Sequence, residues 1–535
     1  MLRRVWPRLR IDDVRSVVNT LGALVTVVAF TMLIPLVAAV ACGEWSCALD
    51  FFISFGAALV LGGAMRLVRP RNRGLSRMQA LVVTGLAWVA VALVSAVPFV
   101  LSGLSASAFD AFFDCIACYT GTGVTLTQNL AHLPVSFGLW RAVMVIVGAQ
   151  GIVLVALGLG TISKFSGAGL LFAAEAHQDK IMPRMAATSR FIALFMGALI
   201  CAGTLACTLV CLLGCGMQPL RALYHGFCLA AASVTTGGVT LMDTGVSYYQ
   251  SPALNAVLMC LMFTGVFSFA VYLLMGRRGP GEFFRDIETR TIIGWAAVVL
   301  VLLVTAFSQD EHFNDVGVFF DKGLFNLVSA VTGTGFCTLS SPQLTVVASS
   351  GVLFAVILAM VMGGATSSAS GGIKAIRAAL VFKSIVSEIR RVLLPTSARE
   401  TIRYYHLGEQ ELTPELSRNA MLVFLLFLLT YMTGAMLGVL YGAEPLDAVL
   451  ESVTCTNNCG ISAGIIGAGL PGVLKTCYLV QMLAGRLEFV ALFATVASIG
   501  VSAARGVGDS PVGRACLNLV PARLRREWTG KRRGR

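Results

Sequence analysis

Four short segments of small polar residues and glycine divide an otherwise apolar sequence. They are Thr120, Gly121, Thr122, Gly123 and Val124; Thr235, Thr236, Gly237 and Gly238; Thr332, Gly333, Thr334, Gly335 and Phe336; and Asn457, Asn458, Cys459 and Gly460. A cation that leaves water needs oxygen ligands in place of its hydration shell, and rings of backbone carbonyl groups supply these without a formal charge. Glycine allows the dihedral angles that turn such carbonyls inward. The residues alone therefore predict a site for a monovalent cation, with ligands from Thr122, Gly123, Thr236, Gly237, Thr334, Gly335, Cys459 and Gly460.

A short amphipathic helix pattern precedes each polar segment and begins near Phe109, Leu220, Phe320 or Leu446. The C-terminal end of such a half-helix carries partial negative charge, which favours a cation beside it. A single segment of this kind is usually an ordinary turn, but a unit that recurs four times at intervals of roughly 100–125 residues indicates a repeat architecture. Irregular backbone at membrane depth is tolerated only when it is buried in protein or lines a water-filled cavity. The four segments therefore predict a pore.

The elements that must position these segments are predicted to be membrane-spanning helices. The chain is 57% hydrophobic and 13% charged, whereas soluble domains carry roughly 25% charged residues. A hydrocarbon core about 30 Å thick needs about 20 apolar residues of helix. We predict ten apolar segments, at 18–42, 49–67, 79–101, 138–160, 191–214, 252–275, 291–307, 350–363, 419–441 and 473–502.

Lysine and arginine are concentrated in alternate connections, namely 1–16, 66–77, 161–190, 277–290, 374–403 and 505–535. The intervening connections are almost free of them, and 101–138 contains none. This positive-inside bias predicts that both termini are cytoplasmic. The formal charge of +13 then reflects membrane topology, and the basic tail is expected to lie near anionic lipid headgroups, with no nucleic acid as a partner.

Together these patterns predict an all-α membrane protein with four pseudo-fourfold repeats, each made of a span, a half-helix and a second span. The expected units are an N-terminal helix pair (1–75), pore repeats at 76–165, 186–278, 288–382 and 410–505, and a basic cytoplasmic tail at 506–535.

A glycine- and serine-rich run, 363–372, interrupts the second span of the third repeat. A helix does not persist well through such a run, and the apolar run before it is short for a complete span. The alternatives are a broken helix inside the membrane and an ordinary cytoplasmic turn. Arg486 is a lone charge in the last span and is therefore a functional candidate, with a structural ion pair as the alternative.

The sequence resembles the Trk/Ktr/HKT superfamily of potassium transporters, and specifically its TrkH-type membrane subunits. The resemblance covers nearly the whole chain and is carried by the segment 120–124, by 139–142 and 148–152, by 251–255, by 363–377, and by 456–460 and 485–488. It implies a selectivity-filter glycine in each repeat, at Gly123, Gly237, Gly335 and Gly460. Glycine at all four positions implies potassium as the transported ion bound in the pore, with no other cofactor.

The resemblance also implies a gate below the filter. Its residues are Gly363, Gly364, Thr366, Ser367, Ser368, Ser370, Gly371, Gly372, Lys374 and Arg486. Further implications are a homodimer in the bacterial inner membrane and a cytosolic nucleotide-binding regulatory subunit of TrkA type, docked on the basic loops at 161–190 and 383–403.

The alignment of the second repeat remains open. His225 precedes its glycine by 12 residues, whereas Asp114, Asn326 and Glu451 precede theirs by 9. Two other functions are weighed against a potassium channel. A proton- or sodium-coupled symporter usually shows inverted repeats and carboxylates within its spans. A membrane-embedded enzyme would need a catalytic motif, and no metalloprotease, P-loop or Ser/His/Asp pattern is present in the sequence.

Overall fold

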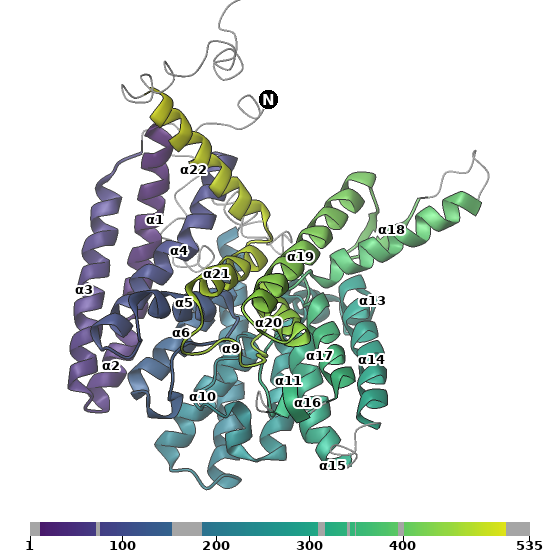
Figure 1. Cartoon of the computed structure of the whole chain (residues 1–535), viewed down its shortest axis with the longest axis horizontal. Helices are drawn as coiled ribbons and strands as arrows, with labels where there is room; N and C mark the ends of the chain where they lie inside the picture. Colours follow the sequence, from purple (N-terminus) through teal and green to yellow (C-terminus); the bar gives the residue numbers. More distant parts are fainter. Residues whose placement is uncertain are drawn as a thin grey trace, which may run out of the picture.

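A computed structural model of the chain describes residues 11–70, 75–151, 185–308, 316–339, 343–347, 349–393 and 401–509. These residues form a helical protein with one two-stranded hairpin (Figure 1). The predicted all-α membrane fold with pore-loop repeats is confirmed. The basic segments at 161–184, 394–400 and 510–535 lie outside the described residues.

The N-terminal helices are α1 (Ile11–Thr31), α2 (Leu33–Ala41) and α3 (Trp45–Leu67). The apolar segment 18–42 is predicted as one helix, but a turn at Met32 separates α1 from α2. Pro35 lies in the first turn of α2, where a residue without an N–H group is tolerated because the first helical N–H groups have no intrahelical partner. In Figure 1, α1, α3 and α4 stand side by side at the left of the molecule.

Each repeat then follows the order span, half-helix, span. The first contains α4 (Arg77–Leu101), α5 (Ala108–Thr120), η2 (Leu130–His132) and α6 (Val135–Gln150); the second contains α9 (Met185–Leu213), α10 (Pro219–Val234), η3 (Gly245–Tyr249), α11 (Pro252–Val266) and α12 (Phe269–Arg278). The third contains α13 (Gly281–Arg285), α14 (Ile287–Ser308), α15 (Val316–Val318), η4 (Phe319–Leu324), α16 (Phe325–Thr332), η5 (Gln343–Val347), α17 (Ser350–Met362) and α18 (Ala375–Leu393). The antiparallel hairpin of β1 (Arg403–Tyr405) and β2 (Glu409–Glu411) leads to the fourth, which contains α19 (Pro414–Leu440), α20 (Pro445–Asn457), α21 (Gly472–Arg486) and α22 (Val490–Asp509).

The half-helices begin at local sequence signals. Ser107 caps α5 by accepting a hydrogen bond from the Asp110 N–H group at 3.1 Å. Pro219 and Pro445 occupy the first turn of α10 and α20, where the missing N–H group costs nothing because the first N–H groups of a helix have no intrahelical partner. The starts of these half-helices are therefore fixed by residues that are adjacent in the sequence.

The repeats interlock in a cycle. The second span of each repeat packs against the half-helix of the next: α6 against α10, α11 against α16, α17 against α20, and α21 against α5. The last of these contacts joins the fourth repeat to the first. The four half-helices are therefore held in a closed arrangement by helices from neighbouring repeats as well as by their own.

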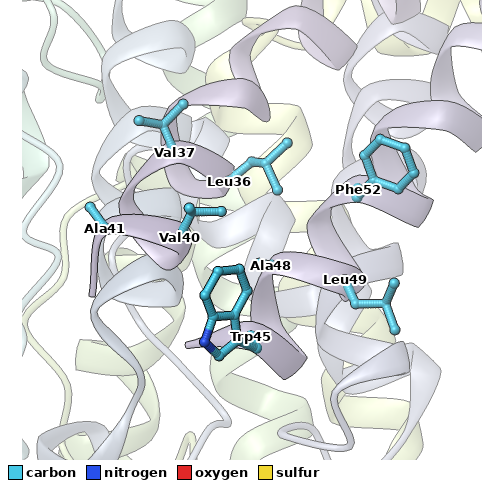
Figure 2. Close-up of a pocket in the computed structure, with 8 residues that line it drawn as sticks. All are labelled: Leu36, Val37, Val40, Ala41, Trp45, Ala48, Leu49 and Phe52. Carbon is cyan, nitrogen blue, oxygen red and sulfur yellow. The ribbon is translucent and has the colours of Figure 1, made fainter. Parts of the chain in front are cut away.

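The outer faces of the helices are apolar. Six described helices are long and apolar enough to cross a membrane, and the bent pairs α11–α12 and α21–α22 qualify when each is counted as one span. Figure 2 shows an open apolar hollow of about 650 Å³ between α2 and α3, into which Leu36, Val40 and Phe52 project. Trp45 lies at its edge and is 70% exposed. Such a surface is suited to contact with lipid.

Two further predicted spans are not continuous helices. The segment 252–275 bends by 89° between α11 and α12, and the segment 473–502 is broken between α21 and α22. In the first, the carbonyl groups of Gly265 and Val266 accept hydrogen bonds from Ala369 and Ala365, at 3.3 and 3.0 Å. These donors lie about a hundred residues later in the chain, so the pattern of the span itself did not reveal the break.

A close glycine contact joins α1 to α3. A Cβ atom on Gly62 would lie 2.6 Å from the Thr26 hydroxyl oxygen and 3.0 Å from the Gly22 carbonyl oxygen. We predict that Gly62→Leu forces these helices apart and destabilises the protein by about 1–3 kcal/mol, the usual cost of overpacking. The readout is the fraction of detergent-purified protein that stays monodisperse after heating.

Gly63→Leu is the matched control, because the neighbouring glycine has open space around its Cβ position. Equal heat sensitivity of the two variants would contradict the proposed packing of α1 on α3.

Candidate functional site

The four half-helices end in the same way. A residue with positive φ follows each of them: Gly121 (φ 78°), Thr236 (φ 49°), Gly333 (φ 71°) and Asn458 (φ 55°). The N–H group of the next residue then donates to the carbonyl five residues back, at 2.9 Å in the first three repeats and 3.0 Å in the fourth. This is the Schellman closure of a helix C-terminus. It turns the chain sharply away from the half-helix at an equivalent point in every repeat.

These equivalent hydrogen bonds correct the sequence alignment of the second repeat. The donors are the N–H groups of Thr122, Gly237, Thr334 and Cys459. The structurally equivalent glycines are therefore Gly123, Gly238, Gly335 and Gly460, and Gly237 matches the residue before them. The alignment failed because two adjacent glycines follow α10 and the sequence pattern does not distinguish them.

The four glycine segments meet in a ring. A Cβ atom on Gly123 would lie 2.5 Å from the Gly237 carbonyl oxygen, and one on Gly460 would lie 2.8 Å from the Thr122 carbonyl oxygen. Cβ atoms on the other two glycines would overlap the backbone of the repeat that follows each. The contacts thus run from the first repeat to the second, third and fourth and back to the first. A side chain at any of these positions would push neighbouring segments apart.

The threonine hydroxyls near the ring bond back to their own half-helices. Thr120, Thr235 and Thr332 donate to carbonyl groups four residues earlier, at 2.8, 2.6 and 2.8 Å. At the equivalent position in the fourth repeat, Asn457 donates to the Met360 carbonyl and accepts from the Tyr431 hydroxyl. These side chains bond to their own half-helices or to the surrounding protein. Between the segments, Gly123 and Gly460 approach backbone carbonyl oxygens of the neighbouring repeat, and the Thr122 hydroxyl accepts a hydrogen bond from Asn458 at 3.0 Å.

Buried acidic or amide side chains hold the segment that follows the ring glycine in three repeats. Asp114 accepts a hydrogen bond from the Leu126 N–H group at 2.7 Å, Asn326 from Thr338 at 3.1 Å, and Glu451 from Ala463 at 2.8 Å. Each donor lies three residues after its glycine. Asp114 and Glu451 are both buried, and these hydrogen bonds assign them a bracing role.

The second repeat is braced differently. The position equivalent to Asp114 is Leu229, and His225 lies one turn earlier in α10, where it forms a 2.6 Å hydrogen bond with the Tyr249 hydroxyl. Sequence reasoning also missed Arg141, which is buried in α6 and donates to the Thr240 carbonyl at 3.0 Å. An arginine within an apolar run was the available signal.

The run 363–374 is a nonhelical loop between α17 and α18, as the glycine and serine composition predicts. It lies directly against the ring-facing ends of two half-helices. A Cβ atom on Gly333 would lie 2.7 Å from the Ser370 hydroxyl oxygen, and one on Gly371 would overlap the Asn457 carbonyl. We refer to Gly363–Lys374 below as the α17–α18 loop.

Three basic side chains surround the α17–α18 loop. Arg486 donates to the Ala369 carbonyl at 2.9 Å and to the Gly148 carbonyl at 2.8 Å, so it joins the loop to the end of α6. Lys374 donates to the Ser370 carbonyl within the loop. Arg377 forms an ion pair with Glu488. Lys374, Arg486 and Glu488 also border a cavity of about 30 Å³, which is room for about one water molecule.

The sequence-predicted residues are thus assembled in two adjacent layers. The residues at 120–124, 235–238, 332–336 and 457–460 form the ring, and the α17–α18 loop, to which Arg486 donates, lies against it at Gly333 and Asn457. The arrangement brings together the backbone of four segments and the negative ends of four helix dipoles. It can hold a partly dehydrated cation, and the described residues of the ring offer no acid–base or nucleophilic constellation.

Comparisons with known proteins agree with this geometry. Residues 49–502 match the TrkH family, described as cation transport proteins. An uncharacterized cation transporter of Methanocaldococcus jannaschii is 30% identical over 500 residues, covering 91% of this chain and 97% of the relative. The Trk system potassium uptake protein TrkH of Escherichia coli K12 is 25% identical over 490 residues, covering 89% of this chain and 97% of its own.

A solved structure has the same fold. The crystal structure of the potassium transporter TrkH from Vibrio parahaemolyticus superposes with a TM-score of 0.75 at 23% identity, over 90% of this chain and 97% of the other. Since the family model spans most of the chain and the fold agrees along nearly all of it, the protein is no enzyme and belongs to the TrkH family of cation transport proteins.

Proposed function

We propose that this chain takes up potassium across the bacterial inner membrane through a channel-like central pore. The observation that supports this most directly is the ring of four glycine segments, closed by the approach of Gly460 to Thr122. Backbone carbonyls in such a ring replace the hydration shell of a cation. The relatives named as potassium uptake proteins supply the identity of the ion.

The proposed ligands are the carbonyl oxygens on either side of each ring glycine. With the corrected alignment, these belong to Thr122 and Gly123, Gly237 and Gly238, Thr334 and Gly335, and Cys459 and Gly460. The half-helices add their negative dipole ends. Potassium is the cargo of this site and not a permanent cofactor.

The α17–α18 loop is the proposed gate. It lies against Gly333 and Asn457, so an ion leaving the ring toward that side meets the loop first. Arg486 holds the loop to α6 through two carbonyl groups. A fixed positive charge at this point opposes a passing cation. Removal of this charge and release of the loop are therefore both expected to increase ion flux.

The remaining features of the proposal come from the resemblance and from the charge distribution. Both termini are placed in the cytoplasm, and the chain acts as a homodimer with a cytosolic nucleotide-binding regulator of TrkA type. The units are the N-terminal pair at 1–75, the four repeats, and the tail at 506–535.

A proton- or sodium-coupled symporter is the second candidate. Asp114 and Glu451 are buried carboxylates of two half-helices, and each accepts at least three hydrogen bonds from the segment that follows its ring glycine. A carboxylate that is held in this way is suited to bracing and poorly suited to carrying protons. This observation favours the channel-like pathway.

The first test concerns selectivity. The test uses a bacterium that lacks its own potassium uptake. We predict that Gly123→Ser lowers the ratio of rubidium to sodium uptake by about tenfold or more. The reason is that a serine side chain displaces the carbonyl ligands, and a loss of about 1.4 kcal/mol in binding free energy corresponds to a tenfold change. Growth on limiting potassium falls in parallel. Gly103→Ser is the control, since Gly103 has a similar positive φ (68°) but open space around it. Unchanged selectivity of Gly123→Ser would count against the filter.

The second test concerns the corrected alignment. A Cβ atom on Gly238 would overlap the Thr334 carbonyl, whereas one on Gly237 would meet a methyl group of Val145. We predict that Gly238→Ala abolishes rubidium uptake, and that the pair Gly237→Ala with Val145→Ala retains it because the shortened side chain makes room. Uptake by Gly238→Ala together with loss in the double variant would restore the original alignment.

The third test concerns Arg486. A hydrogen bond from a charged group contributes about 1.5–3 kcal/mol, so Arg486→Gln is predicted to raise rubidium flux into proteoliposomes by roughly tenfold through a looser loop. Arg221→Gln is the control, because Arg221 lies at the exposed start of α10. Flux that stays at the wild-type rate in Arg486→Gln would argue against a gate at this loop.

A further inference from the structure

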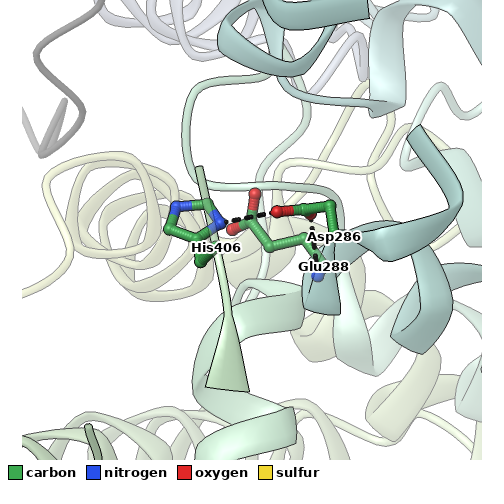
Figure 3. Close-up of side chains that lie close together, drawn as sticks. All are labelled: Asp286, Glu288 and His406. Atoms are coloured by element: carbon green, nitrogen blue, oxygen red, sulfur yellow. Dashed lines mark hydrogen bonds and ion pairs between the residues drawn. The ribbon is translucent and has the colours of Figure 1, made fainter. Parts of the chain in front are cut away.

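Three buried side chains meet where the hairpin joins the start of α14. Asp286, Glu288 and His406 each place a nitrogen or oxygen atom within 4.8 Å of the others (Figure 3). His406 Nδ1 lies 3.0 Å from Asp286 Oδ1, and these side chains are 5% and 2% exposed. Asp286 also accepts hydrogen bonds from the N–H groups of Glu288 and Thr289 and so caps α14. Neither the ring nor the proposed gate uses this cluster directly.

One end of the cluster belongs to the hairpin on the cytoplasmic side. His406 directly follows β1, and the neighbouring Tyr405 donates a hydrogen bond to Glu282 of α13. This bond to a carboxylate raises the pKa of the Tyr405 hydroxyl, which therefore remains a donor at neutral pH. Tyr404 is buried in an apolar cluster with Ile287 and Leu380. The hairpin thus contacts α13, α14 and α18 together.

The other end of the cluster reaches the α17–α18 loop. Glu288 Oε1 accepts a hydrogen bond from the Thr366 N–H group at 2.8 Å and another from the Thr366 hydroxyl at 2.5 Å. Thr366 lies four residues before Ser370, which contacts the end of α16. A continuous series of buried hydrogen bonds therefore runs from His406 through Asp286 and the first turn of α14 to Glu288 and Thr366.

We propose that Asp286, Glu288 and His406 are positioning residues that couple the cytoplasmic hairpin to the α17–α18 loop. The hairpin, held by His406, keeps α14 in the position from which Glu288 holds Thr366. A cytosolic partner that displaces the hairpin weakens this hold and frees the loop. The inference rests on the proposed function of the loop as a gate, and it adds the residues through which the gate is reached from the cytoplasm.

Geometry favours this connection over a metal site. Two carboxylates and one imidazole are a ligand set that divalent transition metals accept. However, the Asp286 and Glu288 carboxylates already accept hydrogen bonds from the α14 N–H groups and from Thr366, and His406 already bonds to Asp286. These partners account for the cluster as a hydrogen-bonded connection, and chelation of metal ions is included in the test.

The test is a double-mutant cycle on the full chain reconstituted in liposomes, with radioactive rubidium influx as the readout. Thr366→Val and His406→Leu are each expected to raise influx about fivefold or more, a typical size for coupling between sites. The double variant is expected to match the larger single effect, because both changes break the same connection. The ratio of rubidium to sodium influx should stay constant, since the ring is untouched.

Conservative variants separate positioning from folding. Thr366→Ser keeps the hydroxyl and His406→Asn keeps a donor in place of Nδ1, so both should retain the wild-type rate. Tyr405→Phe is the matched control, because it removes the adjacent hairpin bond to Glu282 and leaves the series to Thr366 intact. If His406→Leu does not fold, the nearly isosteric Thr366→Val, compared with Thr366→Ser, tests the hold of Glu288 on the loop by itself.

Three results would overturn the coupling: wild-type influx in both Thr366→Val and His406→Leu, effects that multiply in the double variant, or an EDTA-induced rise in wild-type influx that copies His406→Leu. The last would assign the cluster to a metal ion. Absence of rubidium influx in the wild-type protein would instead contradict the proposed function itself.

Discussion

Backbone polar groups inside a membrane must find partners within the protein, and the architecture of this chain depends on that constraint. Four half-helices end at buried residues, and the chain leaves each of them without regular secondary structure. In lipid, every unpaired N–H or carbonyl group would cost several kcal/mol. The Schellman closures, the Asp114, Asn326 and Glu451 braces, and the contacts between successive segments satisfy or enclose this backbone. The proposed filter uses the carbonyl groups of this enclosed backbone as its ligands.

The same constraint explains why the second spans are broken. Where α11 ends at Val266, its last carbonyl groups accept hydrogen bonds from N–H groups of the α17–α18 loop. The carbonyl groups of the loop itself then need hydrogen-bond donors. Arg486 and Lys374 supply donors to the Ala369 and Ser370 carbonyls. A buried charge (Lys374) and a partly buried one (Arg486) thus stabilise irregular backbone, and Arg377 pairs with Glu488 nearby. A loop that is held by a few charged side chains can move when their hydrogen bonds to its carbonyl groups are broken.

Much of the fold and of the site was predictable from the sequence, because both depend on local signals. The apolar runs, the glycine segments and the glycine-serine break appear in the expected places, and Ser107 and Pro219 mark the starts of half-helices. Non-local features were not predictable. The choice between Gly237 and Gly238 depends on a hydrogen bond to Ala232 and on contact with the third repeat. The bend after Val266, the brace by Arg141 and the contact of Glu288 with Thr366 join residues about 80 to 100 positions apart.

The ring itself can be tested by locating the ion. Crystals or frozen-hydrated particles of the purified protein in rubidium or thallium salts would show bound cations by anomalous scattering or by added density. The account predicts density at the centre of the ring, at coordinating distance from the carbonyl oxygens beside Gly123, Gly238, Gly335 and Gly460. Density absent from that position, or found only at a site remote from these four glycines, would contradict it.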